Sequence, residues 1–179
     1  MLDTLTTILA AIGVLAVAFL IYVALQPAEF RIERTTEIGA TADKIFPLID
    51  DLRQFNTWNP FAKADPSVEL TYSGPTSGAG AAYTWIGQKS GAGQMKIETS
   101  VPSSKVTMNL NFTKPFAAQN MAEFTIVPRN AASVVTWAMT GRRPFSHKFM
   151  GTIFNMDKMV GGEFAKGLAS LKAIIEKSA

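Results

Sequence analysis

The sequence predicts an α+β protein in which a curved antiparallel sheet packs on a long C-terminal helix, preceded by one transmembrane helix. Three observations support this fold class: an N-terminal run without charge, a series of short alternating segments separated by turn residues, and a last segment with helical spacing. The chain has 179 residues, which suits one ordinary domain with an appendage. We expect residues 1–28 to form a membrane anchor and residues 29–179 to form the domain.

The N-terminal segment has no charged residue between Asp3 and Glu29, and residues 8–25 are almost wholly apolar. A helix of this length, at about 1.5 Å per residue, spans roughly 27 Å, and its uncharged flanks extend it to the thickness of a bilayer core. A cleaved signal peptide is the alternative, but signal peptides begin with basic residues and have a shorter apolar core of about 7–15 residues. We therefore expect a retained single-pass anchor.

Basic residues near the anchor lie only on its C-terminal side, at Arg31, Arg34 and Lys44. Because lysine and arginine favour the cytoplasmic side of a membrane, this asymmetry predicts a cytoplasmic domain. The net charge is only +3, and the basic residues are scattered along the chain. A nucleic-acid-binding protein usually gathers its basic residues on one face, so we expect no nucleic-acid partner.

Composition excludes several kinds of site. The chain contains no cysteine and a single histidine, His147. Disulfides, iron–sulfur clusters, zinc–thiolate sites and cysteine nucleophiles are therefore excluded, and so is a metal site built from several histidines. The sequence contains no phosphate-binding loop and no nucleophile elbow. We expect neither a metal nor a cofactor, and we assign no catalytic residue.

The domain begins with residues 29–38, where apolar residues or threonine alternate with charged residues, as is typical of a half-buried strand. Thr41 suits the N-cap of a short helix over residues 42–50, and Pro47 inside it predicts that this helix is short or broken. A second short helical segment is expected over residues 51–57, ending at the Trp-Asn-Pro sequence that follows.

Strands dominate the middle of the domain. Turn residues separate six expected strands, at residues 68–72, 81–86, 94–99, 105–112, 121–127 and 133–140. Strands at this spacing form an antiparallel meander. From residue 157 to about residue 177 apolar residues recur every three or four positions, which predicts an amphipathic helix. Gly161, Gly162 and Gly167 would let this helix lie close to the sheet, or would leave space for a ligand.

Five stretches of the domain carry a resemblance to a known family. They are residues 38–46 (IGATADKIF), 49–60 (IDDLRQFNTWNP), 78–85 (GAGAAYTW), 135–139 (VTWAM) and 162–171 (GEFAKGLASL). With these stretches, residues 30–177 resemble the SRPBCC superfamily, which includes Bet v 1 and START domains, in its polyketide cyclase/dehydrase-like branch. The resemblance implies a helix-grip fold. It does not imply cyclase activity, because many members of the superfamily only bind lipids or small molecules.

A curved sheet that grips a helix leaves a space between the two, and this space is a natural ligand cavity. Strand alternation assigns side chains to faces, and the eight methionines of the chain suit irregular apolar space. Glu98 and Glu123 are assigned to outward faces. The residues expected to line a cavity are Trp85, Met95, Met108, Leu110, Phe112, Phe124, Trp137, Met139, Phe154 and Phe164.

The segment of residues 142–156 mixes basic and aromatic residues and joins the last strand to the C-terminal helix. It is either a lid or entrance whose Phe145, Phe149 and Phe154 contact a ligand or the bilayer, or a short helix that closes the open end of the sheet. Arg142, Arg143 and Lys148 would meet anionic headgroups if the domain lies on the membrane.

We expect a membrane-anchored domain that binds a hydrophobic small molecule or lipid. Two alternatives remain at this point. An enzyme of the cyclase, dehydratase or hydrolase kind needs a polar group in the cavity, such as Tyr83, Asn109, Glu123 or His147. A partner-binding module of the bacterial envelope would have a filled core and an exposed apolar patch on the outer face of the sheet.

Overall fold

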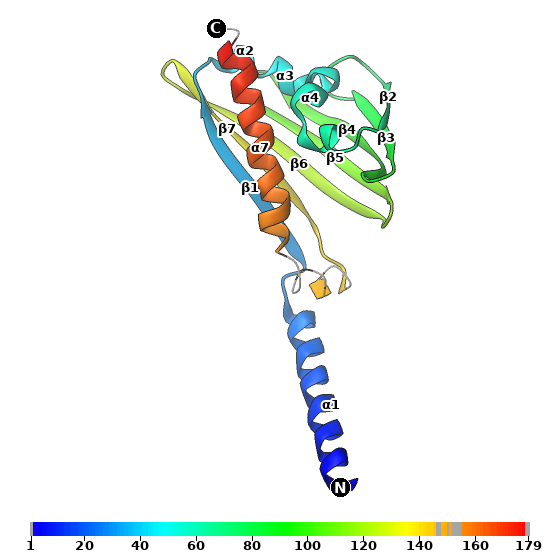
Figure 1. The fold of residues 1–179 in the computed structure, drawn as a ribbon. Coiled ribbons are helices and arrows are strands. Elements are labelled where there is room, and N and C mark those ends of the chain that lie inside the picture. The colour runs from blue at the N-terminus through cyan, green and yellow to red at the C-terminus, as the bar shows by residue number, and fades with distance from the viewer. Residues whose placement is uncertain (1, 146–147, 150, 152–154, 178–179) are drawn as a thin grey trace.

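The computed structural model describes residues 2–145, 148–149, 151 and 155–177 (Figure 1). An isolated N-terminal helix, α1 (Leu2–Leu25), projects away from an α+β domain. The helices and strands of the domain are β1 (Glu29–Ile38), α2 (Ala42–Ile45), α3 (Pro47–Asp50), α4 (Leu52–Trp58), α5 (Pro60–Ala64), β2 (Glu69–Ser73), β3 (Ala82–Gly87), β4 (Gly91–Val101), β5 (Lys105–Lys114), β6 (Ala118–Arg129), β7 (Ala132–Arg142) and α7 (Met156–Lys177).

The described residues form one seven-stranded antiparallel sheet with the order β1-β7-β6-β5-β4-β3-β2. Strands β2 to β7 form the predicted meander, and β1 closes it by pairing along its whole length with β7, from Glu29 opposite Arg142 to Ile38 opposite Ser133. Helix α7 lies across one face of the curved sheet, and α2 to α5 cover the rest of that face (Figure 1). This arrangement confirms the predicted fold class of a curved sheet on a C-terminal helix.

The helical connection between β1 and β2 is more broken than the sequence predicts. Thr41 occupies the N-cap position of α2, but its side chain makes no capping hydrogen bond. Pro47 has no N–H to continue that helix, so a new turn, α3, begins at the proline. Asp51 then caps α4, since its carboxylate accepts a hydrogen bond from the N–H of Arg53 at 2.8 Å. Helix α5 follows at once and was not predicted.

An aromatic cluster forms the centre of the core. The rings of Phe55, Trp58 and Phe124 contact one another edge-on, with centroids 4.9–5.9 Å apart, an arrangement that aromatic pairs prefer. The indole N–H of Trp58 donates a hydrogen bond of 2.8 Å to the carbonyl oxygen of Leu48. This bond ties α4 to α3 and satisfies a donor whose side chain is fully buried.

Two of the three glycines in α7 mark a close approach between this helix and its neighbours. A Cβ atom at Gly167 would lie 2.7 Å from the Trp137 ring and 3.0 Å from Pro60, and one at Gly161 would overlap the guanidinium of Arg34. A Cβ atom at Gly162 would meet nothing within 4 Å. Close packing therefore explains Gly161 and Gly167 but not Gly162.

We expect Gly167→Ala and Gly162→Ala to change stability in opposite directions. At position 167 the added methyl group overpacks the helix–sheet contact, which costs about 1–3 kcal/mol. At position 162 it meets open space and removes the helix penalty of glycine, which stabilises the fold by about 1 kcal/mol. Denaturant unfolding of the two variants beside the natural chain measures both effects. Equal destabilisation by the two substitutions would contradict the packing described here.

Candidate ligand-binding site

A cavity of about 460 Å³ lies between the inner face of the sheet, helices α4 and α5, and the N-terminal half of α7. Its wall is mostly apolar and is built from Phe55, Asn59, Phe61, Ala62, Ala64, Asp65, Val68, Leu70, Tyr83, Trp85, Lys89, Ser90, Met95, Leu110, Phe112, Asn120, Ala122, Phe124, Trp137, Met139, Met156, Val160 and Phe164. This volume and composition suit an apolar small molecule.

Eight of the side chains predicted to line a cavity do so. They are Trp85, Met95, Leu110, Phe112, Phe124, Trp137, Met139 and Phe164. Strand alternation brings them together, because every second residue of β3 to β7 faces α7 and α5. Met108 shares this face but lies in the closed core, fully buried and away from the cavity wall. Phe154 lies outside the described residues, as does His147.

Several wall residues were missed by sequence reasoning. Phe61, Ala62 and Ala64 belong to α5, which is too short to show a helical period. Asn120 lies two positions before Ala122 on β6 and therefore shares its face. The predicted strand began at residue 121, so extending the alternation by one more residue would have found Asn120.

Trp137 lies at the meeting point of the sheet, the cavity and α7. Its ring stacks on that of Phe164, with centroids 4.2 Å apart and planes 11° apart, and it lies 4.9 Å from the ring of Phe124 on its own sheet. The indole nitrogen of Trp137 is buried and is the one such side-chain atom without a hydrogen-bond partner among the described residues. Buried hydrogen-bond donors normally have a partner. The indole N–H of Trp137 is therefore a donor in the cavity wall that could still give a hydrogen bond.

The carboxylate of Asp65 fixes the other side of the cavity wall. One oxygen accepts hydrogen bonds from the N–H and hydroxyl of Ser67, at 3.0 and 2.6 Å. The other accepts from the N–H groups of Lys89 and Ser90, at 2.8 and 2.9 Å, and from the Ser90 hydroxyl at 3.0 Å. The network joins the end of α5 to the turn between β3 and β4. The hydrogen bonds, first that of the Ser67 hydroxyl, hold the pKa of Asp65 well below its usual range.

We expect the stability of the fold to depend on the ionised form of Asp65. Its pKa is lower in the folded chain than in the unfolded chain, so its contribution is present above the unfolded pKa of 3.8 and is lost as the pH falls toward the folded value. The variant Asp65→Asn accepts fewer of these hydrogen bonds and should melt at a lower temperature at neutral pH. Thermal unfolding measured between pH 7 and acid pH should show a weaker loss of stability on acidification for this variant. A pH profile parallel to that of the natural chain would contradict the assignment.

The acidic side chains of the sheet face outward, as predicted. Glu123 forms an ion pair of 2.6 Å with Lys105, and Glu98 lies 3.9 Å from Lys96. Among the described residues, Asp65 is the carboxylate on the cavity wall. Burial raises the pKa of the Tyr83 phenol above its usual value, so this group stays protonated. The described residues contain no group of three or more side chains suited to hold a metal ion.

The curved seven-stranded sheet, the gripped helix α7 and the apolar cavity between them define a Bet v 1-like, or helix-grip, protein. Residues 29–176 match the model of the family described as polyketide cyclase/dehydrase and lipid transport. The chain belongs to this family. Helix α1 lies before the matched residues.

Solved structures share the fold at low sequence identity. A protein from Mesorhizobium loti is 10% identical with a TM-score of 0.62, over 84% of this chain and 99% of its own. The protein Ara h 8.0201 is 11% identical with a TM-score of 0.56, over 83% of this chain and 99% of its own. DynU16, a putative protein of the dynemicin biosynthetic locus, is 13% identical with a TM-score of 0.57, over 83% of this chain and 48% of its own. No curated protein matches the sequence.

Proposed function

We propose that this protein is a membrane-anchored domain that binds a hydrophobic small molecule or lipid in the cavity between the sheet and α7. The observation that carries the proposal is the cavity wall. Aromatic rings, methionines and aliphatic side chains dominate it, and a few polar groups lie among them. The family description includes lipid transport, which agrees with a cavity of this kind. The ligand would occupy this apolar cavity. In a purely structural module, side chains of the core would fill the same space.

The exposure of α1 supports the membrane part of the proposal. The helix is long and apolar enough to cross a bilayer by length and composition. Most of its side chains do not pack on the domain: Leu15 is 70% exposed and Leu25 is 80% exposed, although Val23 near its C-terminal end is buried. A core helix of a soluble domain would bury such side chains. Arg31, Arg34 and Lys44 follow its C-terminal end and no lysine or arginine precedes it, which favours a cytoplasmic domain.

Binding is favoured over catalysis by the polar groups of the cavity. Cyclase or dehydratase chemistry needs a group that gives or takes a proton near the substrate. The Asp65 carboxylate is already engaged by five hydrogen bonds, and Tyr83 holds its proton tightly. Turnover of a bound polyketide by the natural chain, lost in Tyr83→Phe, would replace the binding proposal with an enzymatic one.

We expect the substitution Ala122→Phe to abolish ligand binding without loss of the fold. Ala122 lies on the cavity wall, so a phenyl ring there fills space that the ligand occupies. Native mass spectrometry of the full chain released from detergent should show an adduct on the natural protein, which organic solvent extracts for identification. The adduct should be absent from the variant.

Met121→Phe is the matched control for this experiment. Met121 neighbours Ala122 on β6 but faces the other side of the sheet and is 37% exposed, so the same ring there leaves the cavity open. The control should retain the adduct. An adduct retained equally by both variants, or a natural chain that stays bare after incubation with a lipid extract, would contradict the proposed cavity.

We expect the protein to keep its N-terminal helix in the membrane. A retained anchor leaves the whole chain of 19.3 kDa in the membrane fraction after alkaline carbonate washing, because the apolar helix resists extraction. Intact-mass measurement of the washed protein tests this expectation. A soluble product that lacks the first residues would show instead that α1 is a cleaved signal sequence.

A further inference from the structure

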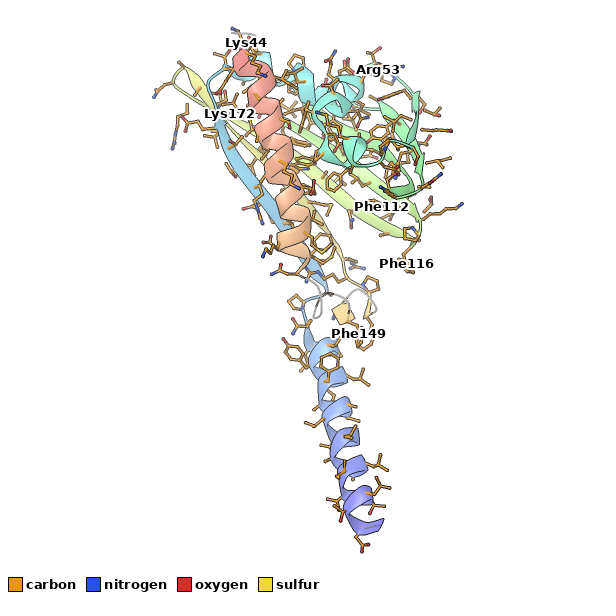
Figure 2. All side chains as sticks on the ribbon, in the orientation of Figure 1. Lys44, Arg53, Phe112, Phe116, Phe149 and Lys172 are labelled. Carbon is orange, nitrogen blue, oxygen red and sulfur yellow. The ribbon has the colours of Figure 1, made fainter. Side chains whose placement is uncertain are left out.

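The turns at one end of the sheet all lie on the side of α1. The register pairs Glu29 with Arg142, Phe112 with Ala118, and Ala92 with Lys114. The first residue of β1, which follows α1, therefore lies at the same end as the β3–β4 turn, the β5–β6 turn and the segment after β7. Figure 2 shows Phe112 and Phe116 near the end of the β5–β6 hairpin, to the side of α1 and above Phe149, which lies at the junction with α1.

Exposed aromatic side chains gather at this end. Phe116, at the tip of the β5–β6 turn, is 73% exposed, and Phe145 is 50% exposed. The ring of Phe149 contacts the ring of Phe19 on α1 edge-on, with centroids 5.8 Å apart. A phenylalanine so exposed at a turn is unfavourable in water, and aromatic residues are enriched where proteins meet the membrane interface.

The same end carries an excess of basic side chains. Lys89, Lys114, Arg142, Arg143 and Lys148 lie on its turns and connections. The ammonium group of Lys148 donates a hydrogen bond of 3.0 Å to the carbonyl oxygen of Ala24 near the end of α1. Of the acids at this end, Asp157 is paired with Arg34 at 2.9 Å, and Asp65 is engaged by the N–H groups of the β3–β4 turn. Glu29 and Glu69, which begin β1 and β2, remain against the five basic residues. Basic residues at this level attract the anionic headgroups of the cytoplasmic leaflet.

We propose that this end of the domain, defined by Phe116, Phe145, Phe149 and the five basic residues above, is a second contact with the membrane that α1 spans. It is called here the membrane-side rim. The bilayer is favoured over a protein partner because the rim is continuous with α1 and combines aromatic with basic side chains. The proposal rests on the proposed anchoring and deepens it.

The rim borders the cavity. Phe112 lines the cavity four residues before Phe116, and Asn120 and Met156 mark the same end of the wall. A rim seated in the headgroup region therefore places this end of the cavity against the bilayer. An apolar ligand then passes between the acyl chains and the cavity without exposing its apolar surface to bulk water, which is unfavourable.

The absence of cysteine from the sequence allows a direct test with single-cysteine variants of the full chain. Lys114→Cys, labelled with an environment-sensitive fluorophore, reports on the tip of the β5–β6 turn while keeping Phe116. Val127→Cys is the matched control, because Val127 is 58% exposed and lies toward the opposite end of β6. Ile12→Cys reports on the middle of α1. Each protein is reconstituted into phosphatidylcholine vesicles that contain phosphatidylglycerol, with and without brominated acyl chains.

The labels at positions 114 and 12 should shift to the blue and lose intensity with brominated lipid, whereas the label at 127 should behave as in water. Adding Phe116→Asp to Lys114→Cys should return the label at 114 to a water-like spectrum while circular dichroism is unchanged. A quenched label at 12 with a water-like label at 114 overturns the rim and leaves the anchor intact. A label at 12 that is never quenched overturns the proposed anchoring itself. A spectrum at 114 that follows protein concentration rather than lipid points to a second copy and also overturns the rim.

Discussion

The stacking of Trp137 on Phe164 holds the sheet and α7 together, and the rest of the domain is arranged around it. Gly167, one turn beyond Phe164, brings the helix close enough for this contact. Toward its C-terminal end the helix packs in the core through the buried side chains of Leu168, Leu171 and Ile175. Toward its N-terminal end Val160 and Met156 border the cavity. One tight contact therefore divides the space under the sheet into a filled core and a cavity.

Polar groups around the cavity act mainly on its shape. The carboxylate of Asp65 accepts hydrogen bonds from two N–H groups of the β3–β4 turn. In the same turn, the carbonyl oxygen of Ser90 accepts a hydrogen bond of 3.3 Å from the indole N–H of Trp85. The Asp65 carboxylate thus orders the backbone of the turn, and that backbone orients the indole ring of Trp85 in the cavity wall. Fully satisfied networks of this kind rigidify a wall more than apolar packing alone. The unpaired indole N–H of Trp137 is the contrasting case.

Much of the fold could be predicted because its signals are periodic. Alternation along β5 and β6 is strict, so the inward side chains of Phe112 and Phe124 follow from their positions, and helical spacing locates α7 to within a residue of its start. Short helices show no such signal. Helix α5 has five residues, fewer than two turns, and its side chains reach the cavity only through tertiary packing. The position of Met108 in the filled core could not be predicted either. Alternation shows which face of the strand a residue is on, but not whether a helix packs directly over it.

The connection between α1 and β1 limits where a bound molecule can go. Only residues 26–28 separate the two elements, and the carbonyl oxygen of Ala28 accepts a hydrogen bond of 2.7 Å from the N–H of Arg143. Even fully extended, three residues reach only about 10 Å. Under the proposed function, the domain cannot leave the surface to ferry its cargo to another compartment. It would keep a bound molecule at one bilayer, where only proteins in that bilayer, or proteins that come to its surface, could receive it.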